Sequence, residues 1–208
     1  MSRQADRRLT KQDTLLIEDI RTTTLEATRR LSDLHPLVAA VRAAVGKRAD
    51  WPETARLVAA ELERHLPSPE VLTEQERAGN PTRYVSHVLH TEPDGAFSIL
   101  ALVWQPGQTT PIHDHLTWCV FGVIQGTEYE ELFVLDEANE CLLEAASNVN
   151  ETGDVSGFAP PGDIHRVRNM GEHTAISIHV YGTDVTRVGS SVRRYYELPV
   201  RAVEQAVS

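Results

Sequence analysis

The second part of the sequence is a series of short apolar segments, and their spacing restricts the fold more than any other feature. After about residue 82, runs rich in Val, Ile, Thr and aromatic residues are separated by Gly, Pro, Asp and Asn. Runs that recur about every 8 to 12 residues with such turn signals are typical of a β-sandwich or a β-barrel. The clearest candidate strands are residues 83–91, 96–104, 118–126, 128–135, 141–147 and 173–182.

The first part of the chain has the periodicity of helices instead. Apolar residues recur every three or four positions from residue 13 to about residue 66, and Pro36 is expected to separate two helical segments. Pro52 and the Glu that follows it mark a further helix start. The prediction is a mainly β fold with an N-terminal α-helical extension. Its expected parts are a helical region at 1–80, a barrel at 81–200 and a tail at 201–208.

Composition and charge disfavour several classes of partner. The formal net charge of −10 argues against nucleic acid and anionic membranes, which are themselves negative. No run approaches the ~18 apolar residues of a membrane span, and the charged first residues do not look like a signal peptide. Two cysteines are too few for a disulfide framework. These features favour a soluble, reduced, cytoplasmic protein.

Two histidines one residue apart, His113 and His115, suggest a metal site. Side chains at i and i+2 of a strand point to the same face, so both imidazoles can reach one ion. Short motifs of this kind also arise by chance, and their context decides. The histidines without a partner at such a spacing are interpreted as ordinary surface or core residues, namely His35, His65, His87, His90 and His173.

The context of the pair resembles the two motifs of the cupin superfamily. The first motif has Gly, His-x-His, Glu and Gly, and this chain matches it from Gly107 to Gly126 except that Cys119 stands in place of the Glu. The second has Pro-x-Gly, His and Asn, and residues 160–169 match it with His165. The resemblance implies a double-stranded β-helix barrel whose mouth holds His113, His115 and His165.

The missing Glu changes the chemistry expected of such a site. Three neutral imidazoles would leave a divalent ion with its full charge and with open positions. Imidazole ligands suit Fe, Zn, Cu and Ni, so the ligand type alone does not select the metal. An open site of this kind favours an anionic substrate with two donor atoms, and a thiolate with a second donor fits that description.

A three-histidine cupin with Cys in place of Glu resembles the thiol dioxygenases, specifically the cysteine dioxygenase family. The resemblance covers roughly residues 83–195 and rests on the segments HDHLTWC, GDIHRVRN and SIHVYG. The neighbours of Cys119 are similar to the bacterial branch of the family. Membership would imply an Fe(II) cofactor, and O2 and a small thiol as partners. The implied reaction adds both oxygen atoms to the thiol and forms a sulfinic acid.

The same resemblance implies catalytic roles for four residues. Ser177, His179 and Tyr181 match the Ser-x-His-x-Tyr strand of the family, and their alternation puts all three on one face. Such a chain of hydrogen bonds can orient the Tyr hydroxyl and move its proton. In animal-type members the equivalent of Cys119 forms a thioether with the equivalent of Tyr181. Many bacterial relatives carry Gly there, so the crosslink stays open for this chain.

The residues that would bind the substrate are less well defined. Cysteine dioxygenases hold the substrate carboxylate with an Arg on an early strand, and 3-mercaptopropionate dioxygenases have Gln there. Arg83 has a similar Thr-Arg context, but counting back from Phe97 places Ser86 at the Gln position and His87 at the Arg position. Arg83 takes the Arg position only if the intervening hairpin is longer, which hairpin loops tolerate.

Other arginines compete for the same role. Arg187 and Arg193 lie beyond Tyr181, where bacterial mercapto-acid dioxygenases also place a carboxylate-binding Arg. Arg166 and Arg168 should face away from His165 and form structural ion pairs. An Arg suits a carboxylate because its planar fork donates two parallel hydrogen bonds. The expected substrate is therefore cysteine, 3-mercaptopropionate or a related small thiol that carries a carboxylate.

Two alternatives remain at this stage. One is another metal-dependent cupin enzyme, such as an isomerase or a different dioxygenase. The other is a non-catalytic cupin that binds a metal or a ligand. The Ser177–His179–Tyr181 strand argues against both, because neither class needs that triad.

Overall fold

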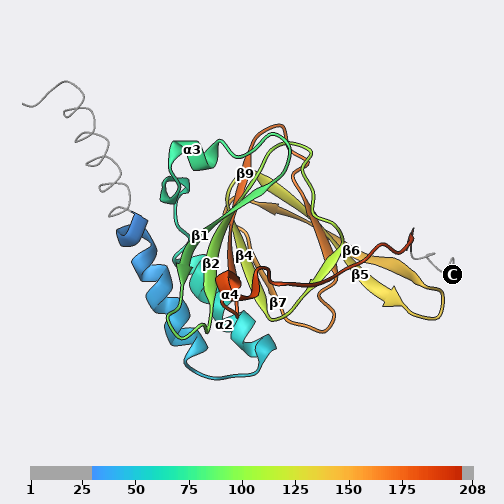
Figure 1. Ribbon diagram of the computed structural model, residues 1–208, viewed down its shortest axis with the longest axis horizontal. Coiled ribbons are helices and arrows are strands. Elements are labelled where there is room, and N and C mark those ends of the chain that lie inside the picture. The colour runs from blue at the N-terminus through green and yellow to red at the C-terminus, as the bar shows by residue number, and fades with distance from the viewer. Residues whose placement is uncertain (1–29, 203–208) are drawn as a thin grey trace, which may run out of the picture.

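Most of the described chain belongs to two β-sheets (Figure 1). The computed structural model describes residues 30–202. One sheet has five strands in the order β1-β2-β9-β4-β7, and the other has six in the order β10-β3-β8-β5-β6-β11. The strands are β1 Val85–Thr91, β2 Ser98–Trp104, β3 His113–His115, β4 Cys119–Gln125, β5 Thr127–Asp136, β6 Cys141–Glu151, β7 Val155–Phe158, β8 His165–Arg168, β9 Ala175–Tyr181, β10 Val192–Tyr195 and β11 Val200–Ala202.

The strand order is that of a double-stranded β-helix barrel, as the sequence predicted. The late strand β9 lies between β2 and β4, and β8 lies between β3 and β5, so successive turns of the chain alternate between the sheets. Gly126 links β4 to β5 with φ +75, and a Cβ there would lie 2.9 Å from the Cα of Ala175. Only Gly combines that backbone conformation with such a close approach. A hairpin turn at residues 92–96 connects β1 to β2.

The central strands of the five-stranded sheet are covered on both faces. Every residue of β2 and β9 is buried. In β2 the residues Ile99, Ala101 and Val103 pack toward the helices, whereas Leu100 and Leu102 belong to a second apolar cluster inside the barrel. Strands that are buried on both faces read as continuous apolar runs, which explains the sequence SILALVW.

Two helices cover the outer face of this sheet. Residues 30–45 are helical, and α2 spans Trp51–Arg64. The Asp50 side chain accepts a hydrogen bond from the backbone N–H of Glu53 and caps α2, while Pro52 occupies its first turn. Gly122 of β4 lets Leu66 approach, because a Cβ there would lie 2.7 Å from the Leu66 Cδ1. The helices and the sheet thus share one core.

The expectation that Pro36 separates two helical segments is wrong. The helix runs through Pro36, although Pro in a helix interior removes a hydrogen bond and costs about 3 kcal/mol. Leu34, Leu37 and Val41 on the same helix are all buried against the barrel. Each buried side chain of this size contributes roughly 1.5–3 kcal/mol, so packing outweighs the local cost.

The remaining elements are short. The segment between α2 and β1 contains a 3-10 helix at Pro69–Val71 and α3 at Glu74–Arg77, and α4 spans Val185–Val188. The parts of the predicted helical region and tail at residues 1–29 and 203–208 lie outside the described residues, so the predicted domain boundaries stay predictions.

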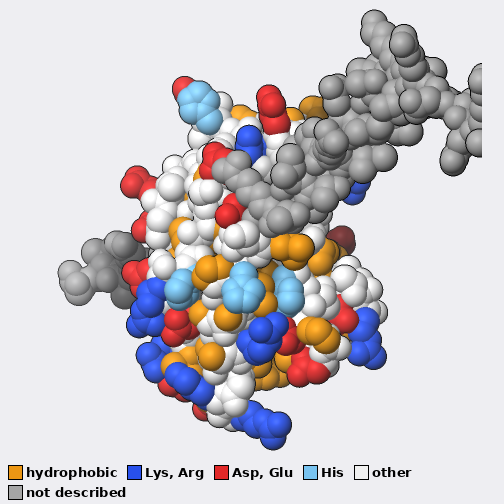
Figure 2. Space-filling model, turned by 90° about the vertical axis from the view of Figure 1, so that its left-hand side faces the viewer, with side chains coloured by type: hydrophobic (Ala, Val, Ile, Leu, Met, Phe, Trp, Pro, Cys, Tyr) orange, Lys and Arg blue, Asp and Glu red, His pale blue; other side chains and the backbone are white. Residues whose placement is uncertain are grey.

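Within residues 30–202, no helix is long and apolar enough to cross a membrane. Figure 2, viewed from the side of the helices and β1, shows acidic, basic and histidine side chains interspersed with hydrophobic ones.

Candidate active site

Three histidines meet on the inner face of the six-stranded sheet. His113 and His115 lie at the two ends of β3, and His165 begins β8, directly opposite His113 in the strand pairing. All three are buried. One ring nitrogen from each lies within 4.8 Å of the other two. The structure therefore brings together the three histidines that the sequence proposed as metal ligands.

The second nitrogen of each of these rings is held by an acceptor. The Nδ1 of His113 lies 3.0 Å from the carbonyl oxygen of Pro111, that of His115 lies 3.1 Å from Asp163 Oδ2, and that of His165 lies 2.7 Å from Glu130 Oε1. An acceptor at Nδ1 selects the tautomer with the proton there and leaves the lone pair on Nε2. The Nε2 of His165 is buried and has no hydrogen-bond partner among residues 30–202. This arrangement is typical of metal-binding histidines.

The electrostatics of the cluster also suit a cation. Burial, followed by repulsion from the neighbouring histidines, lowers the pKa of His113 and of His165 to about 3. Burial would raise the pKa of Asp163, but its hydrogen bonds to His115 outweigh burial and lower the pKa. The imidazoles of His113 and His165 are thus neutral, and buried carboxyl groups lie beside the cluster. Neutral imidazole nitrogens are the form that coordinates a divalent transition metal, so the residues present fit such an ion.

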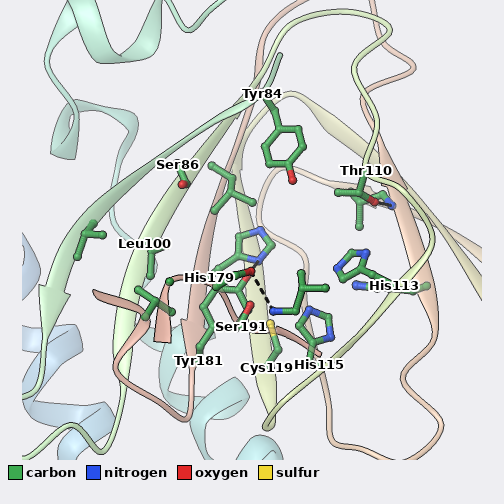
Figure 3. A pocket seen from close by; sticks show the side chains of 18 of the residues that line it. Tyr84, Ser86, Leu100, Thr110, His113, His115, Cys119, His179, Tyr181 and Ser191 are labelled. Carbon is green, nitrogen blue, oxygen red and sulfur yellow. Dashed lines mark hydrogen bonds between the residues drawn. The ribbon is translucent and has the colours of Figure 1, made fainter. Parts of the chain in front are cut away.

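The histidines open into a cavity of about 200 Å³ (Figure 3). Figure 3 shows His113 and His115 on one side, Ser86 and Leu100 on the opposite side, and Tyr84 above them. The ring of Tyr84 stacks on Trp104 with centroids 4.4 Å apart. Most of the wall is apolar, and its side-chain hydroxyls come from Tyr84, Ser86, Thr110, Tyr181, Ser190 and Ser191. A cavity of this size admits a small molecule only.

The predicted Ser-His-Tyr triad forms a hydrogen-bonded chain on β9. The Ser177 hydroxyl lies 2.9 Å from His179 Nε2, and the Tyr181 hydroxyl lies 3.2 Å from His179 Nδ1. Burial and the histidine cluster lower the pKa of His179 to about 3, so its ring is neutral. Burial raises the pKa of Tyr181 well above its ordinary value, which keeps the hydroxyl protonated. The chain ends with the Tyr181 hydroxyl in the cavity.

Cys119 lies opposite Tyr181 in the pairing of β4 with β9 and also lines the cavity. Burial raises the pKa of its thiol well above the ordinary value, and the charge of Glu130 raises it further. A hydrogen bond with Tyr181 acts in the opposite direction. The cysteine is therefore a neutral thiol next to the Tyr hydroxyl.

The arginines that the sequence suggested for substrate binding do not line this cavity. Arg83 and Arg187 are exposed, and Arg193 binds Asp114 on the side of β3 away from the histidines. Ser86, which the register of the Gln-type enzymes had indicated, does line the cavity. The expected ion pairs of the other two arginines are confirmed, because Arg166 and Arg168 both bind Glu131, with Nε to Oε2 distances of 2.6 and 2.8 Å.

Three carboxyl groups near the site were missed by the sequence analysis. They are Glu128 and Glu130 on β5 and Asp163 before β8, and all three are buried. A signal was present, since Glu128 and Glu130 alternate with outward-facing residues on a barrel strand and so share the inward face. Charged residues on an inward face are rare unless they are paired or functional.

Comparison with known proteins places the site in a family context. A family model described as cysteine dioxygenase type I matches residues 79–194. The cysteine dioxygenase type 1 of Homo sapiens is 28% identical over 103 residues, which are 48% of this chain and 50% of the human protein. That of Bos taurus is 27% identical over the same shares. The chain thus spans about half the length of these curated relatives.

Solved structures share weaker similarity with the chain. An oxalate oxidase in complex with the substrate analogue glycolate has a TM-score of 0.42 and 20% identity, covering 54% of this chain and 59% of that one. A cupin superfamily protein from Desulfitobacterium hafniense has a TM-score of 0.39 and 12% identity, covering 51% and 83%. The fold assignment rests on the strand order described above.

Proposed function

Because the chain belongs to the cysteine dioxygenase type I family, we propose that it is an Fe(II)-dependent thiol dioxygenase. The reaction would join a small thiol that carries a carboxylate, such as cysteine or 3-mercaptopropionate, to O2 and yield the sulfinic acid. Both oxygen atoms end on sulfur, whose oxidation supplies all the electrons that O2 takes up. The observation that carries the proposal is the cluster of His113, His115 and His165 in the same small cavity as the hydroxyl of Tyr181.

The three histidines would hold the metal through their Nε2 atoms. Glu130, Asp163 and the Pro111 carbonyl keep the rings oriented by accepting from Nδ1. A bound ferrous ion would supply the Lewis acidity that lowers the pKa of the thiol and the redox chemistry that activates O2. The chain itself would contribute no anionic ligand, because Cys119 replaces the carboxylate of other cupins and is a neutral thiol here.

The other residues of the cavity would orient the reactants. Tyr181 would donate its hydroxyl proton in a hydrogen bond to an oxygen atom that reacts beside the histidines. His179 and Ser177 would hold that hydroxyl in place. The apolar wall formed by residues such as Leu100, Leu102 and Val167 would exclude water and strengthen these interactions.

We assign the substrate carboxylate to hydroxyl groups. Among the described residues that line the cavity, none is Arg or Lys, whereas Ser86 lies across from the histidines and Tyr84 lies above them. A thiolate bound near the histidines would direct its carboxylate toward these hydroxyls. Arg83, Arg187 and Arg193, the candidates from the sequence, would then act at most from outside the cavity.

The proposal is tested by loading the protein with Fe(II) without oxygen and then measuring O2 uptake with a panel of thiols. We expect one sulfinic acid for each O2 consumed with cysteine, 3-mercaptopropionate or mercaptosuccinate, and less with cysteamine, which has no carboxylate. The variant His165→Ala should bind no stoichiometric metal and consume no O2. Metal binding without thiol-dependent uptake would instead support a non-catalytic cupin, and O2 uptake that yields only disulfide would contradict the proposal.

A further inference from the structure

Glu128 is a buried carboxyl group that the proposed reaction does not use. It lies on β5 with 0% of its surface exposed. Neither of its oxygens has a hydrogen-bond partner of ordinary geometry among residues 30–202. Two donors lie beside it, the Ser177 hydroxyl and the indole N–H of Trp104. A buried, poorly paired carboxyl group costs folding energy, so its presence at the end of the Ser177–His179–Tyr181 chain calls for an explanation.

We propose that Glu128 is a positioning residue, the fourth member of this chain, and that it sets the direction in which the hydrogen bonds run to Tyr181. The direction of these hydrogen bonds depends on the neutral ring of His179. A neutral imidazole carries one proton, so of its two bonds, to Ser177 and to Tyr181, one is donated and the other accepted. The Ser177 hydroxyl also has a single proton, which it gives either to His179 or to Glu128.

When Glu128 is ionised, its carboxylate can accept hydrogen bonds but has no proton to donate. Ser177 then donates to Glu128, His179 donates to Ser177 from Nε2, and the Nδ1 of His179 accepts the proton of the Tyr181 hydroxyl. In this arrangement the Tyr181 O–H points at His179. It is not available to a reactant in the cavity.

When Glu128 is protonated, every bond reverses. Glu128 donates to Ser177, Ser177 donates to the Nε2 of His179, and the Nδ1–H of His179 donates to the Tyr181 oxygen. The Tyr181 O–H is then directed into the cavity. The two arrangements differ by the one proton on Glu128, and the ring proton of His179 moves from Nδ1 to Nε2 as that proton leaves.

The surroundings of Glu128 make both forms accessible near neutral pH. Burial raises the pKa of Glu128 to about 7, the charge of Glu130 on the same strand raises it further, and Ser177 and Trp104 act in the opposite direction. The groups that face it from neighbouring strands are neutral, namely Ser177 on β9, Trp104 on β2 and Asn150, its partner on β6. Asn150 is also buried, and its Nδ2 has no hydrogen-bond partner among the described residues.

The direct test is the tautomer of His179, read by nitrogen NMR of the full chain with 15N-labelled histidine. The protein is loaded with diamagnetic Zn(II), and the His179→Gln variant assigns the signal. In the wild type we expect the proton on Nδ1 at pH 6 and on Nε2 at pH 8. In Glu128→Gln we expect Nδ1 at both values, because the amide has no proton to lose and its N–H can donate to Ser177, whose hydroxyl oxygen also accepts from the indole N–H of Trp104 at 3.4 Å.

Two further variants complete the design. Glu151→Gln alters an exposed carboxyl group near Glu128 on the adjoining strand β6 and should behave as the wild type. Ser177→Ala removes the hydroxyl that connects Glu128 to His179. The tautomer of His179 should therefore no longer depend on pH, although Glu128 is intact. A wild-type tautomer that is the same at both pH values would overturn the proposal, as would a Glu128→Gln variant that still switches.

The consequence for turnover rests on the proposed thiol oxidation. We expect the wild-type kcat to fall as the pH rises through about 7, with little change in KM, and this decrease to be absent in Glu128→Gln. A tautomer switch in a protein that oxidises no thiol would contradict the proposed function and leave the role of Glu128 intact. An active protein whose kcat has the same pH profile with and without Glu128 would contradict the role of Glu128 in catalysis.

Discussion

Cys119 and Tyr181 are directly paired across the strands β4 and β9, with both side chains in the cavity beside the histidines. The pairing is held by the ladder of backbone hydrogen bonds between two buried strands, so the contact does not depend on a loop. The two groups interact, since a hydrogen bond between them lowers the pKa of Cys119. A permanent contact between a thiol and a phenol next to an oxidising site allows covalent chemistry between them.

We predict that a thioether forms between these two residues during aerobic turnover. A bond forms between Cys119 Sγ and a ring carbon next to the Tyr181 hydroxyl, the S–H and C–H bonds break, and O2 takes up the two electrons and two protons. Intact mass spectrometry should show a loss of two hydrogen atoms. The loss should be absent in Cys119→Ser and present in Cys141→Ser, whose cysteine is buried at the start of β6. An unchanged mass after many turnovers would exclude the crosslink.

A second prediction concerns Glu130, which accepts from the Nδ1 of His165 at 2.7 Å. Glu130→Gln replaces this acceptor by an amide, which can turn its NH2 group toward the ring and weaken the selection of the tautomer. Loss of such a supporting contact typically lowers metal affinity by roughly 10- to 100-fold. Competition with a chromophoric chelator measures the affinity directly.

The matched control for that experiment is the next residue. Glu131 is also buried on β5, but its carboxylate binds Arg166 and Arg168 instead of a histidine. Glu131→Gln should therefore lower the stability of the protein and leave its metal affinity nearly unchanged. If both variants lost metal affinity to the same extent, Glu130 would affect the metal through the overall stability of the protein and not through its contact with His165.

The pairing of His113 with His115 could be predicted from the sequence because it depends on a local pattern, whereas His165, on a distant strand, was placed beside them only through the resemblance to the cupin motifs. His113 and His115 share a face by strand alternation, and the strand that carries Ser177, His179 and Tyr181 follows the same rule. The path of the helix through Pro36 could not be predicted in this way. It depends on the packing of Leu34, Leu37 and Val41 against a distant sheet, which local propensity does not contain.

The cavity wall opposite the histidines was harder to predict, for a reason that lies in the register of β1. The pairing of β1 with β2 shifts between Val88 and His90, so one strand carries an extra residue. Because each step of one residue exchanges the two faces of a strand, such a bulge keeps a count along the sequence from deciding between Ser86 and His87. In the structure Tyr84, Ser86 and Val88 line the cavity, and Arg83 does not.

A third prediction follows for substrate preference. Ser86→Ala removes a hydrogen bond to the charged carboxylate, worth about 1.5–3 kcal/mol, and should raise the KM for a thiol with a carboxylate roughly 10- to 150-fold. The same variant should have little effect on cysteamine. Arg83→Gln should leave the ranking of kcat/KM among cysteine, 3-mercaptopropionate and mercaptosuccinate unchanged. A reordered ranking in Arg83→Gln would show that this arginine reaches the substrate.

The last prediction concerns the effect of Glu128 on stability. Its pKa is about 7 in the folded protein, against an ordinary value of 4.5 for an unfolded chain. Between these values the unfolded chain has lost the proton that the folded protein still holds. The free energy of unfolding must therefore fall as the pH rises through this window. Each pKa unit corresponds to 1.36 kcal/mol, so the total loss approaches about 3 kcal/mol above pH 7.

Glu128→Gln cannot lose a proton and should remove this dependence. Relative to the wild type, the variant should gain up to about 3 kcal/mol between pH 5 and pH 8. Urea unfolding at the two pH values measures the gain, and the exposed Glu151→Gln supplies the baseline. If the difference between wild type and variant were the same at both values, Glu128 would titrate in the folded protein as it does in the unfolded chain. Its burial on β5 would then have to be relieved by water that reaches the carboxylate.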